Sequence, residues 1–226
     1  MKKMLTCLLL ISLVCFTTVT AQTETRSTLL EAKNIYQGQL EKVAKKEVRK
    51  KIREYKKAHW EIYGTSHSME KTLLDHYIAL EEDGVIEIVS DAVSAIRNIA
   101  RSKLSMRASE LYAHQAQLTL KGRVIDELSS LLNEKEFKEF ENFYAVYEAN
   151  LQKEIYSELR YSYSTIRETT IHGKKVFEFL GFFLLGDEQA HKASLRAYEY
   201  AAKESALRQE HAQKVSEFIN EFYEDK

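Results

Sequence analysis

Two residues near the C-terminus have the spacing in this sequence that is most typical of metal chemistry. Glu188 and His191 are three positions apart, so a helix would present a carboxylate and an imidazole on one face. Di-iron helical bundles use this Glu-x-x-His spacing twice, with two further glutamates, but the sequence contains it once. Glu110 and His114 are four positions apart and do not match it. We therefore predict no metal and no cofactor, and keep a helical metal- or ligand-binding protein using Glu188 and His191 as the alternative function.

Sequence motifs for enzyme catalysis are absent. The chain has no Gly-x-Ser-x-Gly, phosphate loop, dinucleotide fingerprint or zinc-protease motif. Glu87 and Asp91 share one face of an expected strand, but general acid–base chemistry also needs a carboxylate from elsewhere and a cleft, so we interpret them as a solvated sheet face. We predict a non-enzymatic protein with no catalytic residues. A secreted hydrolase would require a carboxylate or serine pair that only folding could bring together.

The first residues have the pattern of an export signal. Lys2 and Lys3 precede an apolar run over residues 5–16, which is too short to span a bilayer core of about 30 Å. Small and polar side chains follow as far as Ala21. We predict a signal peptide over residues 1–21 and an exported protein of the periplasm or cell surface. An uncleaved membrane anchor is the alternative.

Both cysteines of the sequence, Cys7 and Cys15, lie within that segment. The mature chain would then contain no disulfide, thiolate metal site or cysteine nucleophile. Lipid attachment is not expected, because Val14 rather than a small residue precedes Cys15. No later apolar run is long enough for a transmembrane segment. The near balance of 33 basic and 34 acidic residues gives no general attraction to nucleic acid.

The chain contains no proline among 226 residues, which favours long uninterrupted helices. The periodicity of apolar residues alternates between helix-like and strand-like segments. It predicts helices over residues 27–59, 69–82, 95–132, 134–155 and 187–224. It also predicts strands over residues 85–93 and 161–185, the latter forming a hairpin about His172 and Gly173, and a strand or turn over residues 60–63. We expect Ser68 and Asp187 to cap helices, and Asn133 to interrupt one.

These elements predict an α+β fold, with a small antiparallel sheet packed by long helices. Residues 22–226 would form a single domain with helical arms at about 27–59 and 187–224, whereas an all-α bundle is the alternative. Gly122 interrupts a helical stripe at a cost of about 1 kcal/mol relative to alanine. We expect a close approach to another backbone to offset that cost.

A basic stretch from Lys42 to Lys57 contains nine lysines and arginines. In an exported protein such a helix is either an ordinary solvated face or a contact with an anionic envelope polymer or lipid headgroups. Oppositely charged pairs such as Lys50 and Glu54 support the solvated face. We therefore consider an envelope protein or an anionic envelope surface as a partner through this helix.

The order of motifs resembles a family of small envelope proteins. These are the α+β lipoproteins typified by a Helicobacter surface lipoprotein, with secreted relatives in Bacteroidetes. The resemblance rests on four stretches, which are Lys56-Lys57-Ala58-His59-Trp60, the helix from Ala108 through Lys121-Gly122-Arg123-Val124, Leu180-Gly181-Phe182-Phe183, and Ala190-His191-Lys192-Ala193. The chain departs from the family because it lacks the lipid-acceptor cysteine and the proline that often follows the tryptophan.

The resemblance implies an envelope setting and supplies no catalytic residue. Together with the export segment and the absent catalytic motifs, it gives our leading expectation. We expect an exported, non-enzymatic cell-envelope protein that acts through protein or surface contacts.

Overall fold

The structure is a computed structural model that describes residues 42–130 and 132–224. It contains two compact units, Met1–Glu47 and Val48–Lys226. In the first unit, the described residues 42–47 are helical. All the numbered helices and strands belong to the second unit. The predicted signal peptide and the part of the first predicted helix before residue 42 lie outside the described residues.

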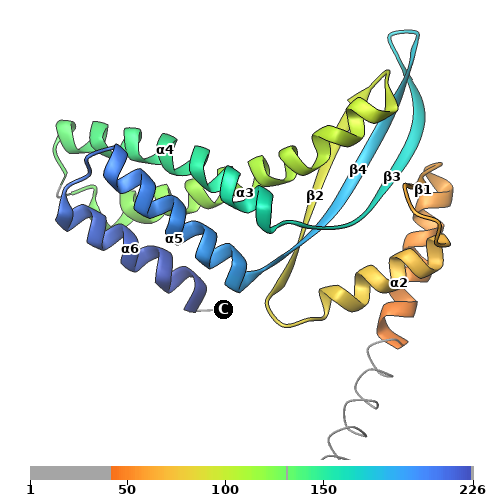
Figure 1. Cartoon of the computed structure of the whole chain (residues 1–226), viewed down its shortest axis with the longest axis horizontal. Helices are drawn as coiled ribbons and strands as arrows, with labels where there is room; N and C mark the ends of the chain where they lie inside the picture. The colour runs from red at the N-terminus through yellow and green to blue at the C-terminus, as the bar shows by residue number, and fades with distance from the viewer. Residues whose placement is uncertain (1–41, 131, 225–226) are drawn as a thin grey trace, which may run out of the picture. The chain divides into compact units, whose positions relative to one another are not determined.

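The predicted α+β architecture, a small antiparallel sheet packed by helices, is confirmed (Figure 1). Residues 48–57 are helical and lead into the numbered elements. In chain order these elements are β1 Glu61–Tyr63, α2 Met69–Leu80, β2 Val85–Ser94, α3 Arg97–Leu128, α4 Glu134–Glu158, β3 Arg160–Ile171, β4 Lys174–Gly186, α5 Asp187–Glu204 and α6 Gln209–Glu224.

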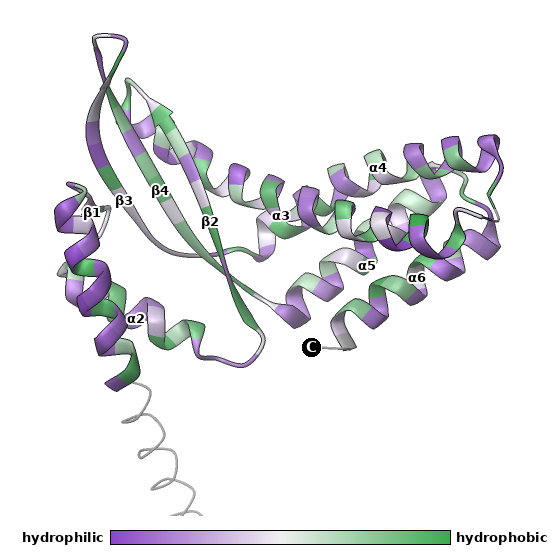
Figure 2. Cartoon of the chain, turned by 180° about the vertical axis from the view of Figure 1, so that it is seen from behind, coloured by the Kyte–Doolittle hydropathy of each residue, from purple (hydrophilic) through white to green (hydrophobic). Residues whose placement is uncertain are grey.

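The four strands pair antiparallel in the order β1-β3-β4-β2. The predicted hairpin joins β3 to β4, where Ile171 pairs with Lys174. His172 and Gly173 both have positive φ angles, of 49° and 77°, as a tight turn between twisted strands requires. The central strand β4 is mainly hydrophobic beyond the turn (Figure 2). This hydrophobicity fits a strand covered on both faces.

One face of the sheet packs against the N-terminal half of α3. Ile88 of β2, Phe183 of β4 and Leu104 of α3 are at most 8% exposed and belong to one core cluster. A Cβ at Gly181 would lie 3.1 Å from Leu104 Cβ and 2.8 Å from Phe183 Cε2. Glycine at this position therefore lets helix and strand approach closely.

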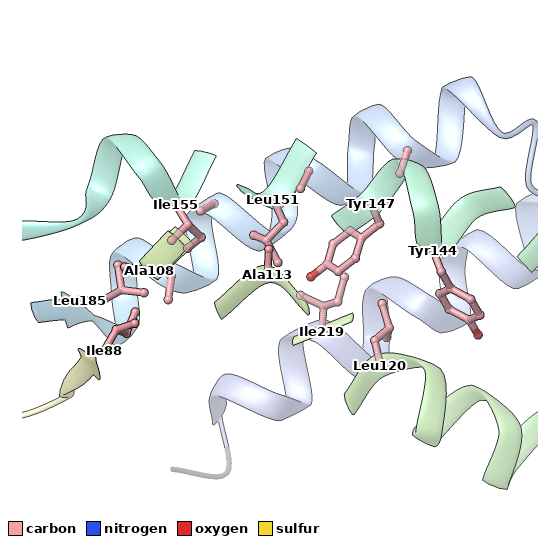
Figure 3. Packing of buried hydrophobic residues seen from close by; sticks show 14 of the residues in the cluster. Ile88, Ala108, Ala113, Leu120, Tyr144, Tyr147, Leu151, Ile155, Leu185 and Ile219 are labelled. Carbon is pink, nitrogen blue, oxygen red and sulfur yellow. The ribbon is translucent and has the colours of Figure 1, made fainter. Parts of the chain in front are cut away.

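The same core continues away from the sheet into a group formed by α3, α4, α5 and α6. Figure 3 shows side chains from Ile88 and Leu185 in the strands to Tyr147 and Ile219 in the helices gathered along one interior. The small-residue face predicted for the last helix is buried in α5. Its alanines are at most 1% exposed, and these are Ala190, Ala193, Ala197 and Ala201. Small side chains there allow α5 to pack closely with α4.

The opposite face of the sheet packs against α2 and the helix over residues 48–57. This smaller core contains Val48, Tyr55, Leu73, Tyr163 and Phe182. The alternation of a strand explains how Phe182 and Phe183 serve different cores, since successive side chains point to opposite faces. Helices thus pack on both faces of the sheet, in a large core with α3 and in a small core with α2 and residues 48–57.

Two of the three predictions about helix starts, at Ser68 and Asn133, are confirmed, and the prediction at Asp187 is wrong. Ser68 caps α2, where its Oγ accepts from the Lys71 backbone N–H at 3.2 Å. Asn133 begins α4 through a reciprocal capping box with Glu136. The predicted cap Asp187 is instead the first residue of α5, and Gly186 occupies the cap position. The Asp187 backbone N–H donates to the Gly84 carbonyl at 2.6 Å, which ties the start of α5 to the residue just before β2.

Two predictions about helices are wrong. The segment over residues 187–224 is not one helix, because the chain turns between Glu204 and Gln209, with Ala206 at a positive φ of 53°. The turn lets α6 fold back on α5, and no glycine or proline signals it. The expected close approach at Gly122 is also absent, since a Cβ there would meet no atom within 4 Å among the described residues.

Within residues 42–130 and 132–224, no helix combines the length and the apolarity needed for a bilayer crossing.

Candidate functional site

A buried histidine on α2 lies at the centre of the most developed polar site. Thr72, Leu73 and His76 form the buried face of this amphipathic helix, and His76 is 2% exposed. Its ring lies edge-on to Tyr163 and Phe182, with centroid distances of 4.9 and 6.0 Å. An imidazole in such apolar surroundings requires partners for both ring nitrogens.

The two partners of His76 come from different strands. His76 Nε2 lies 2.7 Å from Glu87 Oε1, and His76 Nδ1 lies 2.9 Å from Ser162 Oγ. A carboxylate only accepts hydrogen bonds, so Nε2–H donates to Glu87. In the neutral ring Nδ1 is then an acceptor, and the Ser162 hydroxyl donates to it. The arrangement is a directed chain from hydroxyl to imidazole to carboxylate, which we call the Ser162–His76–Glu87 chain.

A β-bulge places Ser162 within reach of the histidine. Tyr161 pairs with Phe183 and Tyr163 pairs with Phe182, which leaves Ser162 as an extra residue in β3. Bulges bend a strand and redirect a side chain, and they are frequent beside functional sites. Glu87 reaches the same point because it is in register with Leu184 and therefore lies on the same face of the sheet as Phe182.

Two buried tyrosines, Tyr163 and Tyr55, extend the cluster of side chains around His76. The Tyr163 ring is stacked on Phe182 at 4.2 Å, and its hydroxyl lies 3.0 Å from that of Tyr55. Burial raises the pKa of both phenols well above the usual value of 10.0. Both phenols therefore remain neutral at physiological pH. They add polar but uncharged groups to the surroundings of His76.

A cavity of about 260 Å³ opens beside this chain. Its walls come from β1, α2, β3 and β4, and from the loop before α2. They combine hydroxyl, aromatic and charged side chains, namely Tyr63, Thr65, His67, Thr72, Asp75, His76, Ala79, Arg160, Tyr161, Ser162, Tyr163 and Leu184. We call this the His76 cavity.

One buried side-chain atom in the wall of the His76 cavity has no hydrogen-bond partner among the described residues. Thr72 Oγ1 is buried and makes no hydrogen bond to any described residue. The charged side chains of the wall are already paired, Asp75 with Lys71 at 2.5 Å and Arg160 with Glu82 at 3.4 Å. An unpaired buried hydroxyl costs about 1–3 kcal/mol, so Thr72 is the wall group that gains most from a ligand.

The structure places Glu188 and His191 on α5, away from the His76 cavity. Glu188 Oε1 accepts from Lys192 Nζ at 2.5 Å, which lowers the pKa of the carboxyl. His191 is directed at a different helix, where Nε2 lies 2.9 Å from Asn220 Oδ1 and the ring is stacked on Tyr223. The two residues share a helix, but they do not share a partner.

The other residues considered from sequence are also separated. His114 pairs with Glu148 of α4 at 3.0 Å rather than with Glu110. Asp91 lies 3.8 Å from Arg107, whereas its strand neighbour Glu87 joins His76. Among the residues that the structure describes, no three His, Cys, Asp or Glu side chains are grouped so that they could hold a metal ion.

The basic helix keeps an exposed charged surface over the part that belongs to the second unit. Lys50, Arg53, Lys56 and Lys57 are all exposed. Glu54 pairs with Lys51 at 3.6 Å and not with Lys50 as expected. The exposed cations are therefore largely uncompensated along this surface.

Sequence reasoning missed His76 and Ser162 as site residues. A single histidine on a helix gives no signal, and a bulge cannot be recognised from a run of strand-forming residues. The one available signal was Glu87, an acidic residue within an apolar strand.

Comparison with known proteins gives no match to a family model, a curated protein or a solved structure. The resemblance to the envelope lipoproteins therefore stays a prediction.

Proposed function

We propose that this is an exported envelope protein that binds a small polar molecule in the His76 cavity. The observation that supports this most directly is the unpaired Thr72 hydroxyl in the wall of a cavity of about 260 Å³. Folding leaves this donor without a partner, and a bound polar group would supply one. Binding alone requires no catalysis, in keeping with the non-enzymatic protein expected from the sequence.

The walls define the kind of ligand. Pockets for drug-sized molecules measure about 300–1,000 Å³, so this cavity suits a molecule near the lower limit, about the size of one sugar ring. Hydroxyls of Thr72 and Ser162 can donate or accept, while Tyr63 and Tyr161 offer aromatic surface. A ligand with several hydroxyls or a carbonyl and one apolar face matches this wall.

The proposed setting rests on the first residues of the sequence and on the family resemblance. A signal peptide over residues 1–21 would deliver the chain across the inner membrane to the periplasm or cell surface. There the exposed cations between Lys50 and Lys57 would meet anionic envelope polymers or lipid headgroups. Vesicles containing phosphatidylglycerol should bind the protein in a salt-sensitive manner, and binding unchanged by salt would contradict this contact.

The binding proposal can be tested by NMR with N-acetylglucosamine, a probe that offers hydroxyls, a carbonyl and an apolar ring face. We expect saturable amide shifts in α2 and β3, centred on Thr72 and Ser162. Thr72→Val removes the unpaired hydroxyl at nearly constant volume and should weaken binding about fivefold to tenfold, as the loss of one hydrogen bond implies. Thr170→Val on the exposed hairpin is the matched control and should bind normally.

Absence of saturable shifts at this cavity in folded wild-type protein would overturn the binding proposal for this ligand class. Equal affinity in Thr72→Val and wild type would show that the unpaired Thr72 hydroxyl does not bind the ligand.

A further inference from the structure

We infer that Ser162 is a nucleophile, and that the His76 cavity hydrolyses small carboxylic esters. This rests on the proposal that the cavity accepts a polar ligand, and it goes beyond binding. It also departs from the non-enzymatic expectation, because folding assembles the serine and carboxylate that the sequence could not bring together.

The direction of the hydrogen bonds supports Ser162 as the nucleophile. Glu87 accepts from Nε2–H and so fixes the tautomer in which Nδ1 carries a lone pair toward Ser162 Oγ, 2.9 Å away. A serine activated by an imidazole that is oriented by a carboxylate is the general arrangement of serine hydrolases. Here the ring uses Nδ1 as the base and Nε2 as the oriented nitrogen. This reverses the two nitrogens relative to the Ser-His-Asp triad, in which Nε2 is the base and Nδ1 is bonded to the carboxylate.

The accessibility of Ser162 from the cavity also supports this role. His76 is 2% exposed, whereas Ser162 is only partly buried and lines the His76 cavity. The base is thus shielded by Tyr163 and Phe182 while the nucleophile faces the space where a substrate would lie. The unpaired Thr72 hydroxyl in the same wall is the donor available to the negative oxygen that forms during attack.

The reaction requires only the ester and water. Ser162 Oγ forms a bond to the carbonyl carbon as its proton passes to His76 Nδ1. The bond from that carbon to the alcohol oxygen then breaks, and the leaving oxygen takes the proton from Nδ1. Water attacks the acyl-serine in the same manner, gives one proton to Nδ1 and releases the acid as Ser162 regains its hydrogen. One ester and one water give one acid and one alcohol, with no change of oxidation state.

The size of the cavity limits the substrate. About 260 Å³ accommodates a short acyl group such as acetyl on a small polar alcohol, but not a long fatty acyl chain. Short-chain esters should therefore react, and long-chain esters should not.

The test uses a fluorophosphonate, which phosphonylates activated serines, with the labelled residue identified by mass spectrometry. We expect labelling of Ser162 in the folded full chain, together with turnover of p-nitrophenyl acetate. Ser162→Ala should abolish both. Ser157→Ala, at an exposed serine near the end of α4, is the matched control and should leave both unchanged.

Glu87→Gln separates activation from a structural role. The glutamine amide can donate to Nε2, which moves the ring proton to Nδ1 and reverses the bond to Ser162. Labelling should slow by about 10³-fold or more. Thermal stability should change little, since Glu87 is partly exposed. Should Ser162→Ala fail to fold, this variant and the site of labelling in the wild type still decide the matter.

Failure to label Ser162 in folded wild-type protein, or equal labelling in Glu87→Gln, would overturn the inference. In either case saturable N-acetylglucosamine shifts at the same cavity would leave the binding proposal standing. Loss of those shifts would overturn binding as well.

Discussion

The two faces of the four-stranded sheet share the same strands yet differ in chemistry. On the α3 face Ile88, Phe183 and Leu104 belong to an apolar core that continues into the helices. On the α2 face a few aromatic side chains surround His76 and leave a polar cavity beside it. Apolar packing on the first face stabilises the fold, and this allows the second face to keep an unpaired hydroxyl and a buried imidazole.

The largest effect should come from a pair of adjacent phenylalanines that point to opposite faces. Phe183→Ala on the α3 face should lower the free energy of unfolding by about 3–5 kcal/mol, since it opens a cavity in the main core. Phe182→Ala removes the ring that packs near His76 and stacks on Tyr163. It should abolish ligand shifts at the His76 cavity even under conditions where the protein remains folded.

Urea unfolding measures the first effect, and NMR at a temperature where both variants are folded measures the second. Normal ligand shifts in Phe182→Ala would contradict the proposal that the α2 face of the sheet forms the ligand site.

The next largest effect on stability is expected at two glycines, Gly181 of β4, which packs against α3, and Gly122 within α3. Gly181→Ala should cost about 1–3 kcal/mol, because the added methyl would crowd Leu104 and Phe183. Gly122→Ala should stabilise the protein by about 1 kcal/mol, since a methyl there meets no atom within 4 Å of the described chain and alanine favours a helix. Thermal melting of both variants gives the comparison. A destabilised Gly122→Ala would show that another surface approaches α3 at that point.

Alkaline pH should affect both regions through their tyrosine pairs. On the α2 face the hydroxyl oxygens of Tyr55 and Tyr163 are hydrogen-bonded at 3.0 Å. In the helical group those of Tyr112 and Tyr223 are hydrogen-bonded at 2.8 Å. Burial raises the pKa of all four phenols above 10.0. Such groups stabilise the fold fully below the unfolded pKa of 10.0, and that contribution is lost as pH rises above it.

Each buried phenol should lower the free energy of unfolding by up to about 1.4 kcal/mol per pH unit above that point. Urea titrations across pH 10 and the ultraviolet absorbance of phenolate measure this loss. Smooth phenolate formation without unfolding would show that these pairs are accessible to solvent.

The smallest effect is expected at the α5 residues that first suggested metal binding. Glu188→Gln removes an exposed pair with Lys192 and should change stability by less than about 0.5 kcal/mol. Zinc or iron should not shift the melting temperature of the wild type differently from that of the variant. A metal-dependent shift of the melting temperature that requires Glu188 and His191 would restore the metal-binding alternative. It would also place a second polar site on α5, apart from the His76 cavity.

Short-range patterns determined much of the fold. The cap at Ser68, the turn at His172 and Gly173 and the alanine face of α5 were predictable, because each depends on residues within a few positions of one another. The break at Ala206 was not predictable, because a residue without turn preference adopts a positive φ only when the packing of α6 on α5 stabilises it.

The sequence by itself determined an α+β chain, the helix that contains His76 and the strand that carries Glu87. Only the tertiary structure decided that these two residues meet each other and Ser162, which lies 86 positions from His76. The bulge that turns Ser162 toward the ring depends on how β3 and β4 align over their whole length. Local preferences act over a few residues, whereas a polar site requires the combined packing of helix, sheet and hairpin.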